Sequence, residues 1–84
     1  MSINEIGKQR ESIYNDLMEA AKTLLPIKEH QGFDEYKTQV IKAMTDYCQA
    51  LKSGKEYQLF CQKWGLDQDE FIGEILEVAI KSIK

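Results

Sequence analysis

The sequence predicts an all-α protein: a compact four-helix domain with long first, second and fourth helices and a short third helix. Apolar residues recur at spacings of three and four in four successive segments, which is the period of an amphipathic helix. The single proline and nearly all of the five glycines lie where one of these segments would end or turn. A chain of 84 residues has room for one small core, so residues 1–84 are expected to form a single helical domain.

The first helix is expected to begin at Ser2, where Glu5 three residues later would complete a capping box. It should end at Leu25, because Pro26 disfavours helical geometry in the residue before it. The segment from Ile27 to Phe33 is expected to be a connecting loop. The apolar face of this helix is formed by Ile3, Ile6, Ile13, Tyr14, Leu17, Met18, Ala21, Leu24 and Leu25.

The second helix is expected to begin after Asp34, whose carboxylate is a suitable N-cap. Ser53-Gly54 should end it. A stripe of apolar residues at helical spacing would be buried. It consists of Tyr36, Val40, Ile41, Met44, Tyr47, Cys48 and Leu51.

The short third helix follows directly, and Ser53 could also cap it, because Glu56 stands at the capping-box position. Gly65 is well placed as the left-handed residue after this helix. Leu66 would then fold back on Cys61, which is the contact that accompanies a Schellman end. The apolar residues of this helix are Tyr57, Leu59, Phe60, Cys61 and Trp64.

The fourth helix has the strongest end signals in the chain. Asp67 is the expected N-cap, with Glu70 at the capping-box position and Asp69 in the first turn, where negative charge is favoured. Lys81 and Lys84 stand at the opposite end, where positive charge is favoured. Both ends therefore agree on the position of the helix.

The apolar residues of the fourth helix cover an arc of about 200°, roughly twice the width needed to pack on one neighbour. Either the helix is central and packed on two sides, or part of the arc meets another chain, as in a homodimer. Gly73, at the border of the arc, would permit a close helix approach in both cases. The arc consists of Phe71, Ile72, Ile75, Leu76, Val78, Ala79, Ile80 and Ile83.

The composition is that of a folded, acidic protein. Hydrophobic residues make up 43% and charged residues 30%, which predicts a packed core and not a disordered chain. The net charge of -3 argues against a general attraction to nucleic acid or to anionic membranes. No stretch approaches the apolar length of a membrane span, so a soluble, cytoplasmic protein without a membrane partner is expected.

Residues with catalytic or metal-binding chemistry are few and scattered. His30 is the only histidine and lies in the polar connecting segment. Cys48 and Cys61 fall on the apolar sides of their helices, where we expect reduced and buried thiols. The close cysteine pair of a zinc site and the glycine-rich loops of phosphate sites are both missing. We therefore expect no enzyme activity, no metal and no cofactor.

One stretch is similar to a helix-turn-helix unit, which binds nucleic acid. It runs from residue 57 to residue 76, and the resemblance rests on Phe60, Cys61, Trp64-Gly65-Leu66 and Phe71. The resemblance implies a nucleic-acid-binding regulator that uses residues 52–76. Its contacts to phosphate would come from Lys52, Lys55 and Lys63.

The start of the fourth helix departs from that family. A helix-turn-helix reads DNA with the first residues of its second helix, and here these include Asp67, Asp69 and Glu70. Carboxylates repel a polyanion, where basic or amide side chains are expected. Nucleic-acid binding is therefore the alternative and not the first hypothesis.

The first hypothesis is a non-catalytic protein–protein interaction module: a small regulator, inhibitor, immunity-type or assembly protein. A wide apolar arc lies beside an acidic ridge on the fourth helix, and an apolar surface with a charged rim suits protein recognition. The partner would be another protein or, in a homodimer, a second copy of the chain. The contacts expected on this helix are Glu70, Glu74, Glu77, Ile72 and Ile80.

Overall fold

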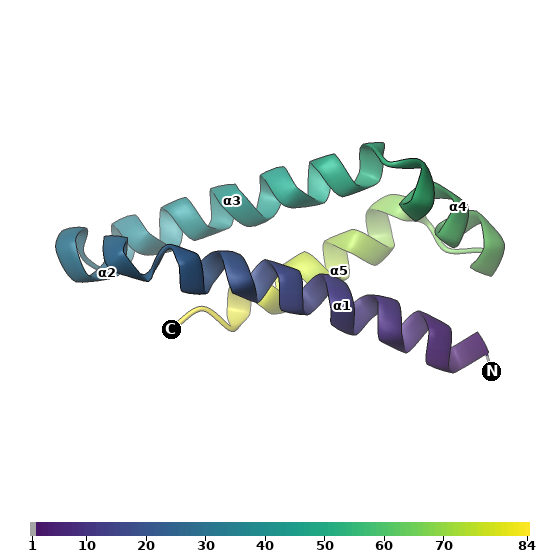
Figure 1. The fold of residues 1–84 in the computed structure, drawn as a ribbon, viewed down its shortest axis with the longest axis horizontal. Helices are drawn as coiled ribbons and strands as arrows, with labels where there is room; N and C mark the ends of the chain where they lie inside the picture. The colour runs from purple at the N-terminus through teal and green to yellow at the C-terminus, as the bar shows by residue number, and fades with distance from the viewer. Residues whose placement is uncertain (1) are drawn as a thin grey trace.

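The computed structural model describes residues 2–84, with side chains from residue 4 onward. It is all-α, and the four expected helices are present as three long ones and a short one (Figure 1). A further short helix follows the first. The helices are α1 (Ser2–Thr23), α2 (Leu25–Gln31), α3 (Phe33–Ser53), α4 (Lys55–Trp64) and α5 (Gln68–Lys81).

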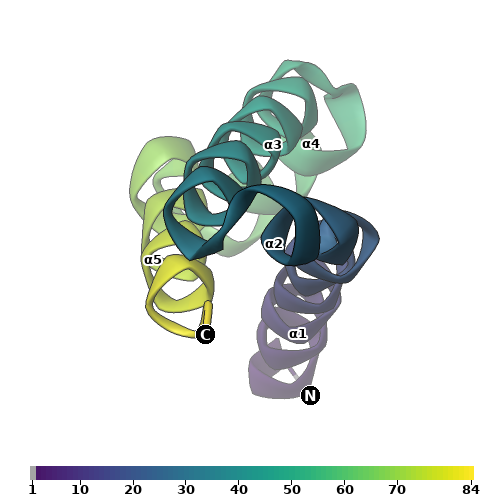
Figure 2. The same cartoon turned by 90° about the vertical axis from the view of Figure 1, so that its left-hand side faces the viewer.

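The three long helices run alongside one another and enclose the core between them (Figures 1 and 2). The short α2 leads the chain from α1 back to α3 at one end, and α4 crosses from α3 towards α5 at the other end. The molecule measures 44 × 23 × 17 Å. Its radius of gyration of 13.9 Å exceeds the value of about 12 Å typical of this chain length, so the bundle is elongated.

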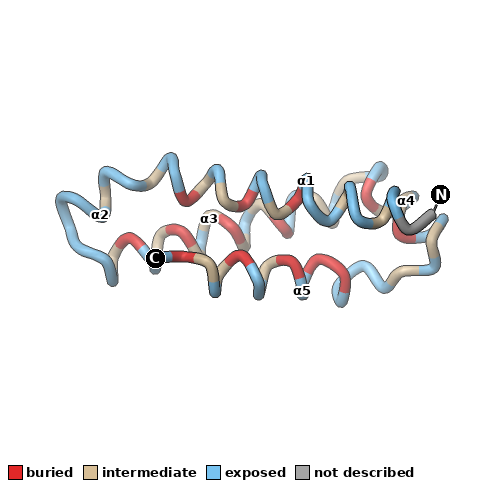
Figure 3. The backbone as a smooth tube through the Cα atoms, turned by 90° about the horizontal axis from the view of Figure 1, so that it is seen from below, coloured by how far each residue is buried: buried red, intermediate tan, exposed pale blue. Residues whose placement is uncertain are grey.

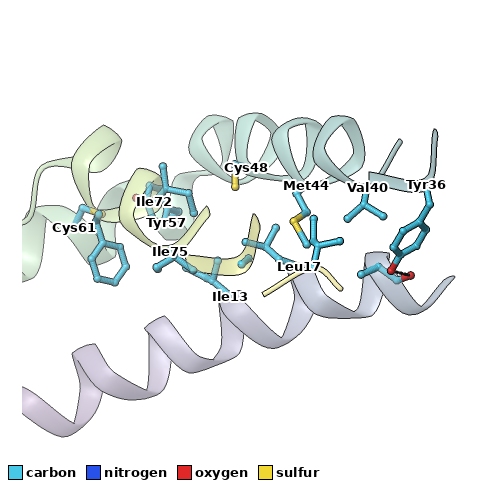
Figure 4. Close-up of a cluster of buried hydrophobic side chains, with 14 residues drawn as sticks. Ile13, Leu17, Tyr36, Val40, Met44, Cys48, Tyr57, Cys61, Ile72 and Ile75 are labelled. Atoms are coloured by element: carbon cyan, nitrogen blue, oxygen red, sulfur yellow. Dashed lines mark hydrogen bonds between the residues drawn. The ribbon is translucent and has the colours of Figure 1, made fainter. Parts of the chain in front are cut away.

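The core is a single apolar layer along the inner faces of the three long helices, and α4 adds Tyr57 and Cys61 to it at one end (Figure 3). Among the described residues, every buried side chain is apolar or a tyrosine or cysteine. The Tyr36 hydroxyl donates a hydrogen bond of 3.0 Å to the Ala21 carbonyl, as Figure 4 shows, and the Tyr57 hydroxyl donates one of 2.5 Å to the Gln68 carbonyl. The core consists of Ile13, Leu17, Ala21, Tyr36, Val40, Met44, Cys48, Tyr57, Cys61, Phe71, Ile72, Ile75, Ala79 and Ile83.

The expected loop from Ile27 to Phe33 is largely helical, which corrects that prediction. Helix α1 ends at Thr23, and Leu24 leaves helical geometry with φ −95° and ψ 6°. Pro26 then lies in the first turn of α2, where its missing N–H costs no hydrogen bond. Pro26 therefore follows the end of α1 and also begins α2. Gly32, with a φ of 95°, ends α2.

Two of the expected caps are wrong, because in each case a glycine takes the cap position. Gly32 is the N-cap of α3, and Asp34 lies inside its first turn. Gly54 is the N-cap of α4, while Ser53 belongs to the last turn of α3 and its hydroxyl bonds back to the Gln49 carbonyl at 3.1 Å. The expected capping box at Ser2 rests on a side chain outside the described residues.

The turn between α4 and α5 has the predicted geometry. Gly65 is left-handed, with φ 66° and ψ 32°, and the Leu66 N–H donates to the Cys61 carbonyl at 2.8 Å, as in a Schellman end. The Glu70 N–H donates to the Asp67 carboxylate at 2.9 Å, so Asp67 caps α5. These local bonds fix where α5 begins and how it leaves α4.

Candidate protein-binding surface on α5

Helix α5 packs on α1 along one edge. The guanidinium of Arg10 on α1 is 3.6 Å from the Glu74 carboxylate. The Tyr14 hydroxyl donates to the Ser82 hydroxyl at 3.1 Å. These contacts place the edge of α5 that carries Glu74, together with Ser82 at the C-cap of the helix, against α1.

The opposite side of α5 packs on α3. The Lys52 ammonium of α3 is 2.7 Å from the Asp69 carboxylate at the start of α5. The sequence left two explanations for the wide apolar arc: packing on two sides within the chain, or contact with another chain. Packing on α1 and α3 accounts for the residues in the middle of the arc, because these are buried. The buried residues of α5 are Phe71, Ile72, Ile75 and Ala79.

The predicted contact residues divide into two groups. Glu70, Glu74 and Glu77 are exposed, and Ile80 is half-buried at the edge of the core. Ile72 is only 4% exposed, because it lies in the middle of the arc between the two neighbouring helices. A partner cannot reach it, so its prediction as a contact residue is corrected.

A first hollow lies where α1 and α5 meet. Its volume is about 320 Å³, and its walls are almost entirely apolar. Val78 stands in it with 55% of its surface exposed, beside the core residue Ile75. The α1 side is made by Gly7, Arg10 and Tyr14. Sequence reasoning missed these α1 residues, since no local pattern indicates which helix faces Val78.

Arg10 is held in place at the rim of this hollow. Its guanidinium lies 5.1 Å from the centre of the Phe71 ring and also forms the ion pair with Glu74. The positive charge is therefore matched within the chain. The carboxylate of Glu11, which also lines the hollow, is exposed.

A second hollow of about 290 Å³ lies on the outer side of α5. It is lined by Gly73, Leu76, Glu77, Ile80 and Lys81, all from this one helix. The expectation that Gly73 permits a close approach inside the chain is not met. Outside the backbone of its own helix, none of the described residues comes within 4 Å of a Cβ placed there.

The lysines of the nucleic-acid alternative are not equivalent. Lys52 is bonded to Asp69, and only 27% of its side chain is exposed. Lys55 and Lys63 are exposed, and the Lys63 ammonium lies 5.0 Å from the centre of the Trp64 ring. The turn of a helix-turn-helix is present, but Lys52, one of the three lysines, forms an ion pair with Asp69 of α5.

The potential catalytic and metal-binding residues lie apart from the two hollows. His30 is exposed on α2. Cys48 and Cys61 are free thiols in the core, and burial raises the pKa of Cys48 despite the nearby Lys52 ammonium. Within residues 2–84, the structure brings together no group of three or more His, Cys, Asp or Glu that could hold a metal ion.

Within the described part of the chain, every helix is too short or too polar to cross a membrane. Comparison with known proteins yields no family model that matches the chain. No curated protein matches its sequence, and no solved structure matches its fold. The function is therefore inferred from the surface of the molecule.

Proposed function

We propose that this protein is a non-catalytic module that binds another protein through α5, as a small regulator, inhibitor, immunity-type or assembly protein. The observation that carries the proposal is the hollow between α1 and α5. An aliphatic side chain, Val78, is 55% exposed inside an apolar depression whose rim is charged. An apolar centre with a polar rim is the usual anatomy of a protein interface.

The charge around the hollow defines the chemistry of the partner. From residue 67 to residue 84 the chain carries five acids against two lysines, a net charge of -3. The nearest cation, Arg10, is already paired with Glu74. A complementary partner would place an apolar side chain beside Val78 and surround it with lysine or arginine. A basic amphipathic helix meets both requirements.

The state of the cysteines supports a reducing compartment. Both thiols are free and buried, and burial raises the pKa of Cys48, which keeps the thiol protonated and unreactive. We propose the cytoplasm as the location, because proteins there keep their thiols reduced.

The test uses two exposed aliphatic residues as a matched pair. Val78 on α5 and Leu59 on α4 are 55% and 59% exposed, so neither substitution removes a core residue. A protein captured from the source cells by the wild-type chain would be identified, purified and titrated by calorimetry against Val78→Asp and Leu59→Asp. We expect Val78→Asp to weaken binding by about 100-fold, or roughly 2.7 kcal/mol, as loss of a central contact does.

A control variant and a charge-reversal variant complete the test. Leu59→Asp should bind like the wild type. Replacing the exposed acid that lines the hollow, Glu11→Lys, should weaken binding of a basic partner in low salt more than in high salt. Thermal unfolding of each variant separates lost binding from lost structure. Equal binding by Val78→Asp and the wild type would overturn the proposal.

A further inference from the structure

The outer hollow of α5 has the geometry that a second helix requires. Its corners are Gly73, Leu76, Glu77 and Ile80, at positions i, i+3, i+4 and i+7 of one helix. Four residues with this spacing form the hole that receives a side chain from the facing helix when two helices pair. The hollow therefore has the residue spacing of one side of a helix–helix contact.

In a single copy of the chain, Gly73 lowers the stability of α5. A glycine inside a helix is less stable than alanine by about 0.5–1 kcal/mol. Gly73 lies mid-way along α5, its surroundings leave space for a side chain, and the described residues give no steric reason for its absence. A second helix lying over this position supplies that reason, because glycine lets it approach closely.

The charges of α5 are arranged for an antiparallel neighbour. Glu70 stands near the start of the helix, whereas Lys81 and Lys84 stand at its end. Lys81 already forms an ion pair of 3.1 Å with Glu77 of its own helix. A second α5 running in the opposite direction therefore brings its Lys84 opposite Glu70. A parallel copy would instead set acid against acid and lysine against lysine, which is repulsive.

We propose that the outer face of α5, formed by Gly73, Leu76, Glu77 and Ile80, joins two copies of this chain in an antiparallel pair. The two-fold axis passes through the centre of the hollow. Leu76 of each copy packs against Leu76 of the other beside this axis, and the space above Gly73 receives the second copy's Ile80. Glu77 of each copy lies beside the axis with its charge balanced by Lys81 of its own helix. Glu70 lies opposite the second copy's Lys84.

This contact goes beyond the proposed function, because it uses a different edge of the helix. At 100° per residue, the outer hollow is centred about 150° around α5 from Val78. In Figure 2 the outer side of α5 lies along the margin of the molecule, away from α1. A pair of copies can therefore form while both α1–α5 hollows remain open.

Sedimentation velocity and light scattering of the full chain, with reductant and over a wide concentration range, test the pair. We expect a dimer that dissociates on dilution. Gly73→Gln should fill the hole and weaken the dimer by at least about tenfold, or 1.4 kcal/mol. Because it replaces a mid-helix glycine, it should also raise the melting temperature of the dilute monomer. The two opposite effects exclude unfolding as the cause.

Three further variants locate the contact. Ile80→Asp should weaken the dimer, whereas Val78→Asp and Leu59→Asp should leave it intact. Glu70→Lys should weaken it, and the same chain carrying Lys84→Glu as well should regain it. The inference is overturned by a monomer at every concentration, or by a dimer that survives Gly73→Gln and Ile80→Asp. A dimer lost in Val78→Asp alone would also overturn it, since the contact would then lie at the α1–α5 hollow.

Discussion

The hydroxyl of Tyr47 on α3 donates a hydrogen bond of 2.6 Å to the carboxylate of Asp16 on α1, and so joins two of the three long helices. Burial of the phenol raises the pKa of Tyr47 from 10.0 to about 12, and the bonded carboxylate adds to the shift. The neutral phenol is the donor, so the folded state holds this proton more tightly than the unfolded chain does.

We expect this bond to make stability depend on pH in the alkaline range. Below pH 10, Tyr47 is protonated in both states and its contribution is complete. Above pH 10 the unfolded chain releases the proton while the folded chain retains it, so stability falls until the pH passes about 12. Urea unfolding at several pH values should show a smaller loss in Tyr47→Phe than in the wild type. Burial also raises the pKa of Tyr57, which is present in both proteins. Only the difference between the wild type and Tyr47→Phe therefore reports the contribution of Tyr47.

The caps of α4 and α5 predict a loss of stability for one alanine substitution and almost no change for another. Asp67→Ala removes the acceptor of the Glu70 N–H and should lower the free energy of unfolding by about 0.5–2 kcal/mol. Ser53→Ala removes a hydroxyl that caps neither neighbouring helix and should change it by less than about 0.5 kcal/mol. Chemical denaturation of the two variants at the same pH measures both. Equal losses would show that the cap of α5 is not at Asp67.

Two glycines should respond to alanine in opposite directions. Gly65 is left-handed, so Gly65→Ala should cost about 1–2 kcal/mol. Gly7 is helical and has open space around it, so Gly7→Ala should add about 0.5–1 kcal/mol. For a domain of this size 1 kcal/mol corresponds to about 4–8 °C, which a calorimetric melt resolves easily. A loss of stability in Gly7→Ala would contradict the open surroundings of that residue.

Salt dependence separates protein binding from nucleic-acid binding. With Lys52 bonded to Asp69 and acids at the start of α5, we expect no binding of duplex or single-stranded DNA or RNA in fluorescence anisotropy at low salt. Phosphate contacts would give an affinity that falls steeply as salt rises. Binding that weakens in Lys55→Ala and Lys63→Ala would instead favour the regulator that uses residues 52–76.

Local signals in the sequence predicted the part of the fold around α5 well. Gly65 and Asp67 act on backbone atoms within a few residues of themselves, so their roles can be inferred from spacing alone. The same reasoning failed at Asp34 and Ser53, where a neighbouring glycine took the cap position. It also failed after Pro26, since a proline that ends one helix is equally suited to begin another.

Contacts between helices could not be predicted in the same way. The width of the apolar arc on α5 was visible, but Ile72 and Val78 both belong to it, and only the positions of α1 and α3 decide that Ile72 is buried and Val78 exposed. The α1 wall of the hollow, including Arg10 and Tyr14, depends on the same packing. The acids of α5 were correctly expected at the surface because they lie outside the arc; their role in binding stays a prediction.

The two tyrosines bonded to carbonyls lie towards opposite ends of the core (Figure 4). Apolar side chains alone would tolerate a slide of one helix along another by one turn, about 5.4 Å. Such a slide would leave the hydroxyl of Tyr36 or Tyr57 buried without an acceptor, at a cost of about 1–3 kcal/mol each. The hydroxyl of Tyr36 therefore sets the axial alignment of α3 on α1, and that of Tyr57 adds a side-chain bond to the turn that already fixes α4 against the start of α5. One oxygen atom thus distinguishes between alignments of α1 and α3 that the apolar surfaces alone would accept.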